Sequence, residues 1–370
     1  MPQNLKALTS LRFIAAMWVV SYDYWHDLMA VTPRLVSKGY LGVELFFVLS
    51  GFILSHVYLQ GFGTRSFRYA DFLWARLARV YPVHLATLLG MGALIAGATL
   101  LGVQAGDKAL VWSSLPAQLT LTQAWGLGLH GGWNHPSWSI SAEWFAYLTF
   151  PVFAALAWAL RRRPGLAVIL ALILVAVLEI GFERLAGFPL TRATIAWGAL
   201  RIVPCFALGC AVHLLWSARP ILRPSLAITS AAASLGAILL ATQTGAPDAV
   251  AIALFGALIY SLAGLASAGT RLLTAAPLVY LGEVSFAVYM MCIPWQLVFE
   301  KAAHRILGLA EGPMPLALWL AMFAGVVPAA MILHHLVERP ARDAMRRHGV
   351  PFQRNRTRLA ARSAALVAGN

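Results

Sequence analysis

Long apolar stretches recur along the whole chain. Continuous apolar runs lie at residues 8–28, 40–60, 82–104, 141–160, 164–182, 193–215, 222–241, 247–267, 277–299 and 315–336. They are about twice the ~10 residues that a membrane-spanning strand needs, and they do not alternate. A helix of about 20 residues crosses a hydrocarbon core of about 30 Å. The pattern predicts an all-α integral membrane protein with about ten transmembrane helices.

Composition supports the same class. Of the 370 residues, 60% are hydrophobic and 11% are charged, against roughly 25% charged in soluble domains. The cysteines lie in apolar segments without metal-ligand spacing, so neither a disulfide framework nor a metal site is predicted: Cys205, Cys210 and Cys292. The first apolar run lacks a small-residue cleavage site, so a cleavable signal peptide is not expected.

Basic residues predict the orientation. The net charge is +14, but Lys and Arg lie between apolar runs, where they set membrane topology, so nucleic acid is not an expected partner. With the apolar runs as spans, 19 of the 28 Lys and Arg residues fall on one side and 7 on the other. The positive-inside rule then places both termini in the cytoplasm.

Two connections and the C-terminus stand out. Residues 61–81 carry arginines and aromatics, and are predicted to be an interfacial, partly helical cytoplasmic segment. Residues 105–140 form a tryptophan-rich outer loop. The expected organisation is one transmembrane domain over 1–340 and a basic cytoplasmic tail over 341–370, flexible or resting on anionic lipid.

Charged residues within the first span are functional candidates, since they are costly in a bilayer. At 100° per residue, Arg12, Asp23 and His26 share one face of a helix. Arg12 and Asp23 are separated by about 16 Å of rise, so they occupy different depths of that face. The alternative is that each one snorkels to an interface.

Three further charged residues lie in or beside later spans. Glu44 is either functional or an interfacial partner of Lys38. Glu143 lies in the first turn of a helix that Ser139 or Ser141 can cap, so capping alone would explain it. Arg201 is buried more deeply and needs an anion, either a carboxylate such as Glu179 or a substrate group.

The cytoplasmic segment presents a pair of arginines. Arg76 and Arg79 are three residues apart, so both guanidinium groups project from one side of a helical turn. Guanidinium forks bind phosphate oxygens bidentately, and the phosphates of lipids are the alternative ligand. Arg65, Arg68 and Tyr81 belong to the same segment and to the same predicted phosphate site.

An ordered set of motifs resembles the acyltransferase-3 family of integral-membrane O-acyltransferases. The motifs are LTSLRFIAAMWVVSYDYWH, GYLGVELFFVLSGFIL, FLWARLARVYP, LTQAW, PSWSISAEWFAYLTFP, LRIVPCFALG, YLGEVSFAVYMMCIP and LVERPAR. The resemblance implies transfer of an acyl group, usually acetyl, from cytoplasmic acyl-coenzyme A to a hydroxyl of a glycan or lipid-linked sugar. It also implies a bacterial inner membrane, with acetyl-coenzyme A as a co-substrate and no tightly bound cofactor.

The chain departs from the family pattern at two histidines. The family has a histidine eleven residues after the arginine that matches Arg12, where this chain has Asp23. A second expected imidazole, after Tyr289, is replaced by Cys292. Three explanations for Asp23 stay open: an inactivating replacement, introduced for instance for structural work; a natural carboxylate base; or transfer of the role to His26.

These observations lead to an expected division of labour. Position 23 is the predicted base, Glu143 orients the base or the hydroxyl, and Arg12 or Arg201 stabilises the thioester oxyanion. The acceptor is expected to contact outer tryptophans and polar groups near the spans: Glu44, Arg201, Trp133, Trp138 and Ser141. The rival functions are a transporter or flippase of a lipid-linked glycan and a non-catalytic subunit of an envelope complex.

Overall fold

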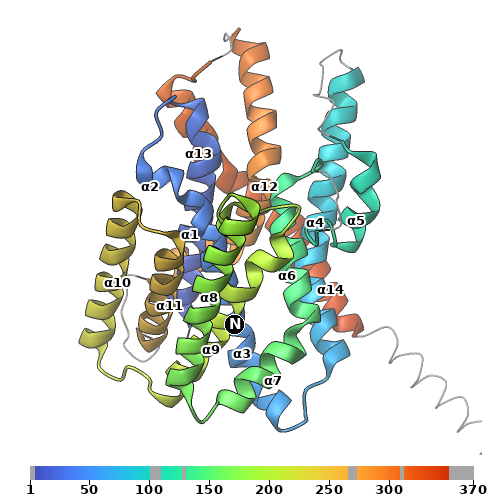
Figure 1. Cartoon of the computed structure of the whole chain (residues 1–370). Helices are drawn as coiled ribbons and strands as arrows, with labels where there is room; N and C mark the ends of the chain where they lie inside the picture. The colour runs from blue at the N-terminus through green and yellow to red at the C-terminus, as the bar shows by residue number, and fades with distance from the viewer. Residues whose placement is uncertain (1–4, 101–109, 127–130, 266–272, 309–311, 350–370) are drawn as a thin grey trace, which may run out of the picture.

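The computed structural model describes residues 5–100, 110–126, 131–265, 273–308 and 312–349, and every element in them is helical (Figure 1). The longer helices are α1 (Lys6–Tyr24), α3 (Gly42–Gly63), α4 (Tyr69–Leu100), α6 (Trp138–Leu148), α7 (Phe150–Leu160), α8 (Pro164–Ala186), α9 (Gly198–Ala218), α10 (Pro224–Thr244), α11 (Asp248–Gly264), α12 (Ala276–Leu307), α13 (Leu316–Leu333) and α14 (Arg339–His348). Short pieces include α2 (Arg34–Ser37), α5 (Leu115–Thr120), and the tight turns η1 (Trp25–Asp27), η2 (Gly39–Leu41), η3 (Trp112–Ser114), η4 (His135–Ser137) and η5 (Leu190–Arg192). A π-helical turn, η7 (His334–Glu338), joins α13 to α14.

The predicted all-helical membrane class is confirmed. Among the described residues, seven helices are long and apolar enough to span a bilayer, and the α6–α7 pair, bent by 57°, makes an eighth if it counts as one span. The remaining two predicted runs lie on α1, which carries Arg12 and Asp23, and on α11, which has 17 residues. Each of the ten runs is therefore helical over most of the part that the structure describes, while the number of spans stays a prediction.

Two segments are more ordered than the sequence predicts. The connection predicted over 61–81 is largely helical, because α4 begins at Tyr69 and continues through Pro82. Residues 341–348 of the predicted tail belong to α14, which packs on α4 through a hydrogen bond from Trp74 Nε1 to the Met345 carbonyl (2.9 Å). The rest of the predicted tail lies outside the described residues.

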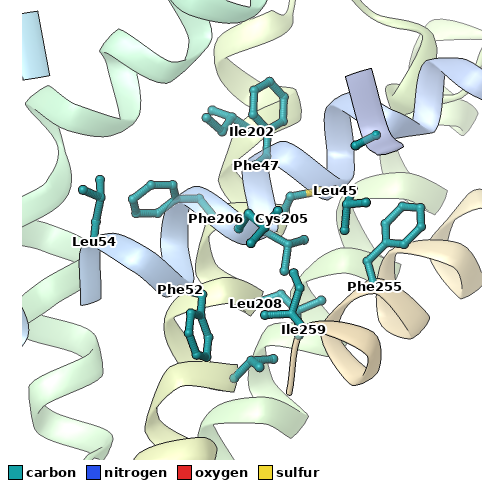
Figure 2. Close-up of a cluster of buried hydrophobic side chains, with 14 of the residues drawn as sticks. Leu45, Phe47, Phe52, Leu54, Ile202, Cys205, Phe206, Leu208, Phe255 and Ile259 are labelled. Atoms are coloured by element: carbon teal, nitrogen blue, oxygen red, sulfur yellow. The ribbon is translucent and has the colours of Figure 1, made fainter. Parts of the chain in front are cut away.

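The centre of the bundle is the contact between α3 and α9. Glycines allow the two backbones to approach: a Cβ on Gly51 would strike the Phe206 carbonyl, and one on Gly209 would strike the Val48 carbonyl. Figure 2 shows the apolar side chains around this contact, which come from α3, α9 and α11. This close contact with α9 holds α3 in place, and another face of α3 lines the cavity described below.

The connections group at opposite ends of the bundle. The α3–α4, α7–α8 and α9–α10 connections lie at the lower end in Figure 1, and α2 and the end of α12 lie at the other. The lower end carries the arginine-rich connections, including Arg161, Arg162, Arg163, Arg219 and Arg223. The sets of connections that the charge count placed on one side therefore do lie at one end, whereas Lys108 and Arg271 lie outside the described residues.

Candidate active site

A cavity of about 440 Å³ lies between α1, α3, α4, α6, α12 and α14. Its size is in the range of small-molecule sites. The polar residues that line it come from all six helices: Arg12, Ser50, Tyr58, Arg76, Arg79, Ser139, Glu143, Tyr147, Tyr289 and Arg346. Three groups predicted separately from sequence, the α1 arginine, the α4 arginine pair and the α6 carboxylate, thus lie in one cavity.

The cavity has a large excess of positive charge. Its charged lining consists of Arg12, Arg76, Arg79, Arg346 and a single carboxylate, Glu143. Within the described part of the chain, none of these four guanidinium groups has an ion pair or a hydrogen bond, and Arg76 Nε is buried without a partner. Buried polar groups are almost always satisfied in proteins. An anionic ligand would supply the missing partner.

Glu143 has a fixed orientation. Ser50 Oγ on α3 donates a hydrogen bond to Glu143 Oε1 (2.7 Å). Tyr147 lies one turn further along α6 and lines the same cavity. Arg12 is within electrostatic range of Glu143 and of Glu338. A carboxylate held in this way, close to a guanidinium, can accept a proton while the guanidinium stabilises an oxyanion.

Asp23 lies outside the cavity, on the α1–α12 interface. Cys292 Sγ contacts Asp23 Oδ2 at 3.8 Å and donates to the Tyr289 carbonyl at 3.0 Å. Tyr289 lines the cavity, so the Cys292 thiol contacts both Asp23 and the backbone of a lining residue. The two residues that replace the expected histidines, Asp23 and Cys292, are therefore in contact with each other.

His26 lies apart from the cavity that Arg12 lines. The α-helix ends at Tyr24, and His26 follows in the tighter turn η1. The His26 side chain is 70% exposed and its Nε2 pairs with Asp27 Oδ1 (3.0 Å). It lines a separate pocket together with Glu300. The structure therefore gives no support to a transfer of the base role to His26.

Arg201 and Glu44 form a buried ion pair away from the cavity. Arg201 Nε donates to Glu44 Oε1 (2.5 Å) and Nη2 donates to Oε2 (3.0 Å). Glu44, rather than Glu179, is the carboxylate that compensates Arg201. Lys38 pairs instead with Asp248 (2.5 Å). Glu44 and Arg201 therefore compensate each other outside the cavity lining, and their expected contact with substrate stays a prediction.

Trp133, Trp138 and Ser141, which were predicted to contact the acceptor, are buried and hold the fold together through their own contacts. Trp133 is buried and its Nε1 donates to the Val111 carbonyl (3.0 Å). Trp138 is buried, and the Arg201 guanidinium lies over its ring, with Cζ 4.6 Å from the centre of the ring. Ser141 Oγ donates to the Leu121 carbonyl (2.8 Å). None of the three presents a free face, as an acceptor platform requires.

Only two of the five residues predicted to bind phosphate line the cavity. Arg76 and Arg79 line the cavity, whereas Arg65 is exposed in the turn before α4 and Arg68 pairs with Asp71 (2.9 Å) on the surface. Tyr81 Oη donates to the Leu119 carbonyl (3.1 Å) and is not part of the lining.

Sequence reasoning did not select several lining residues. Tyr147 had a usable signal, because it follows Glu143 by four residues and so lies on the same helical face. Ser50 and Tyr289 had none, because hydroxyl groups are common in membrane helices. Arg346 was hidden in a segment predicted to be a tail.

Comparison with known proteins identifies the family of the chain. A family model described as an acyltransferase domain matches residues 5–335, and the chain therefore belongs to the acyltransferase-3 family. A relative named acyltransferase MdmB, from Streptomyces mycarofaciens, is 30% identical over 371 residues, which cover 91% of this chain and 91% of the relative. A protein named protein 2 in picA locus, from Rhizobium radiobacter, is 28% identical over 193 residues, which cover 48% of this chain and 97% of that protein. No solved structure matches the chain.

Proposed function

We propose that this protein transfers an acyl group, most simply acetyl, from cytoplasmic acyl-coenzyme A to a hydroxyl of a glycan or a lipid-linked sugar in a bacterial inner membrane. The observation that carries this proposal is the convergence of Arg12, Arg76, Arg79 and Glu143 on one cavity. The family membership and the acyltransferase name of a relative support the reaction class.

The donor would lie along the cavity with its phosphates on α4. Arg76 and Arg79 project from one side of a helical turn, which suits the two phosphates of a diphosphate. Pantetheine is thin and mostly apolar, and the apolar lining, including Phe46, Ile53 and Phe286, suits it. The thioester would then lie near Arg12 and Glu143.

In the transfer step, the reacting groups are Glu143 and Arg12. Glu143 accepts the proton of the acceptor hydroxyl as its oxygen attacks the thioester carbon. Arg12 donates hydrogen bonds to the oxyanion. The carbon–sulfur bond breaks, and the thiolate of coenzyme A takes the proton from Glu143, which returns the carboxylate to its starting state. The acceptor would arrive from the opposite end, past Tyr289 and Asp23.

Purified protein in detergent, incubated with radiolabelled acetyl-coenzyme A and membrane glycolipid, tests the proposal. We expect labelled acetyl in the lipid or glycan fraction, and loss of coenzyme A binding in the double variant Arg76→Ala/Arg79→Ala. The matched control is Arg65→Ala/Arg68→Ala, which removes two arginines of the same segment outside the cavity. Movement of a lipid-linked sugar without consumption of acetyl-coenzyme A would identify a transporter instead.

A further inference from the structure

The C-terminal helix α14 is fixed against the mouth of the cavity. It lies beyond the residues that the family model matches. Trp74 Nε1 on α4 holds its backbone at Met345 (2.9 Å). At its start, buried Glu338 contacts His334 Nδ1 (2.8 Å) and Arg342 Nη1 (3.5 Å).

This attachment brings Arg346 to the cavity. Arg346 lines the cavity and is exposed, so it lies at the open end. Arg342, Arg76 and Arg79 are all within electrostatic range of it. Asp343, the nearest acidic residue in sequence, contacts Arg342 (3.9 Å) instead. In the part of the chain that the structure describes, Arg346 has no acidic partner.

Three guanidinium groups therefore gather at one opening without a counter-charge. Like charges repel, so this arrangement costs free energy unless an anion joins it. The buried, unpartnered Arg76 Nε independently points to an anion at the same place. Because Arg346 belongs to a different helix from Arg76 and Arg79, it is suited to a phosphate separate from the diphosphate that the α4 pair would hold.

We propose that Arg346 binds the 3′-phosphate of the coenzyme A donor, so that α14 makes the enzyme selective for 3′-phosphorylated donors. This inference rests on the proposed function. A donor whose thioester points inward places its diphosphate in the middle and its ribose 3′-phosphate outermost. The arginines follow the same order: Arg12 beside Glu143, then the α4 pair, then exposed Arg346. A phosphate monoester carries about −1.5 to −2 charge at pH 7, which matches an exposed guanidinium.

Equilibrium binding of coenzyme A and of 3′-dephospho-coenzyme A to the full-length protein in neutral detergent tests this inference. We expect the parent protein to prefer coenzyme A by about tenfold, because a charge-assisted hydrogen bond is strong but is weakened by solvent at an open mouth. Arg346→Ala should abolish the preference while leaving the affinity for the dephosphorylated ligand unchanged. The control is Arg347→Ala, which removes an equal charge from the next residue of α14, one that does not line the cavity.

Each other outcome has a distinct meaning. Absence of binding for both ligands would overturn the proposed function itself. Equal affinity of the parent for both ligands would overturn the role of Arg346 and leave the proposed function standing. An equal loss of the preference in Arg347→Ala would assign the preference to the overall positive charge of α14 and would overturn the specific role of Arg346. A preference that disappears when anionic lipid is added would assign Arg346 to lipid phosphate and would also overturn the inference.

Discussion

Glu143 is the residue whose chemistry is easiest to isolate. Glu143→Gln keeps the size of the side chain and an oxygen for the Ser50 hydrogen bond, but removes the ability to accept a proton. We expect acyl transfer to fall about 10²–10⁴-fold, the range for loss of a general base, while coenzyme A binding is retained. Single-turnover transfer together with ligand binding measures both.

The control for Glu143 is Ser50→Ala. It removes only the hydrogen bond that orients the carboxylate, so a smaller loss of transfer is expected. Full activity of Glu143→Gln would exclude this carboxylate as the proton acceptor.

The role of position 23 can be tested by introducing the histidine that the family has there. Asp23→His introduces an imidazole, which accepts a proton near neutral pH, beside Cys292 on the α1–α12 interface. We expect transfer of labelled acetyl to rise. Asp23→Asn is the control, because it changes the charge without supplying a base. Unchanged transfer in Asp23→His would remove position 23 from the mechanism.

Arg201 and Glu44 should affect stability rather than donor binding. Removing one partner leaves a buried charge uncompensated, at a cost of about 3–5 kcal/mol. Arg201→Met is therefore expected to lower the thermal unfolding temperature in detergent markedly, and Arg201→Met/Glu44→Leu to recover most of the loss. If Arg201→Met unfolded at the parent temperature, the pair would have no stabilising role.

At the scale of single residues, sequence reasoning found charged groups in apolar runs but not their partners. Arg12 and Glu143 were selected because charged side chains in or beside a membrane span are costly, and Arg76 and Arg79 because they lie three residues apart in the cytoplasmic segment. All four line one cavity. Spacing along one helix cannot tell which other helix is adjacent, and for this reason Arg201 was not matched to Glu44.

The α3–α9 contact can be tested with alanine substitutions of glycine. Gly209→Ala places a methyl group against the Val48 carbonyl, a backbone atom that cannot rotate away. We expect a clear drop in the thermal unfolding temperature, because overpacking a tight contact costs about 1–3 kcal/mol. Gly236→Ala on α10 is the control: its Cβ would meet nothing within 4 Å, so no loss is expected. Equal stability of both variants would contradict the close approach of the two helices.

Among the elements, the existence of the helices followed from the apolar runs, but several boundaries did not. The sequence placed the third apolar run at residues 82–104, after an interfacial and only partly helical segment over 61–81. The structure continues the helix through Pro82 from Tyr69, because Phe72 and other side chains of this stretch are buried against the bundle. Burial of one face can stabilise a helix that its local sequence alone would interrupt.

For the whole molecule, the orientation in the membrane is open to a direct test. The native cysteines are all buried, so labelling by a membrane-impermeant maleimide should have a low background. We expect Thr244→Cys, at the end of α10, to react in intact cells. Arg162→Cys, at the opposite end of the bundle, should react only after permeabilisation. The reverse pattern would contradict cytoplasmic termini.

The π-helical turn η7 has a consequence for how such chains diverge. A π-helical turn holds one residue more than an α-helical turn, so η7 absorbs an extra residue between α13 and α14. Deleting one residue between His334 and Glu338 would turn this stretch into ordinary α-helix and leave the side chains of α14 facing nearly the same way, whereas a deletion inside α14 would rotate every later side chain by about 100°. The turn is therefore the place where related chains can differ in length by one residue while Arg346 keeps its direction.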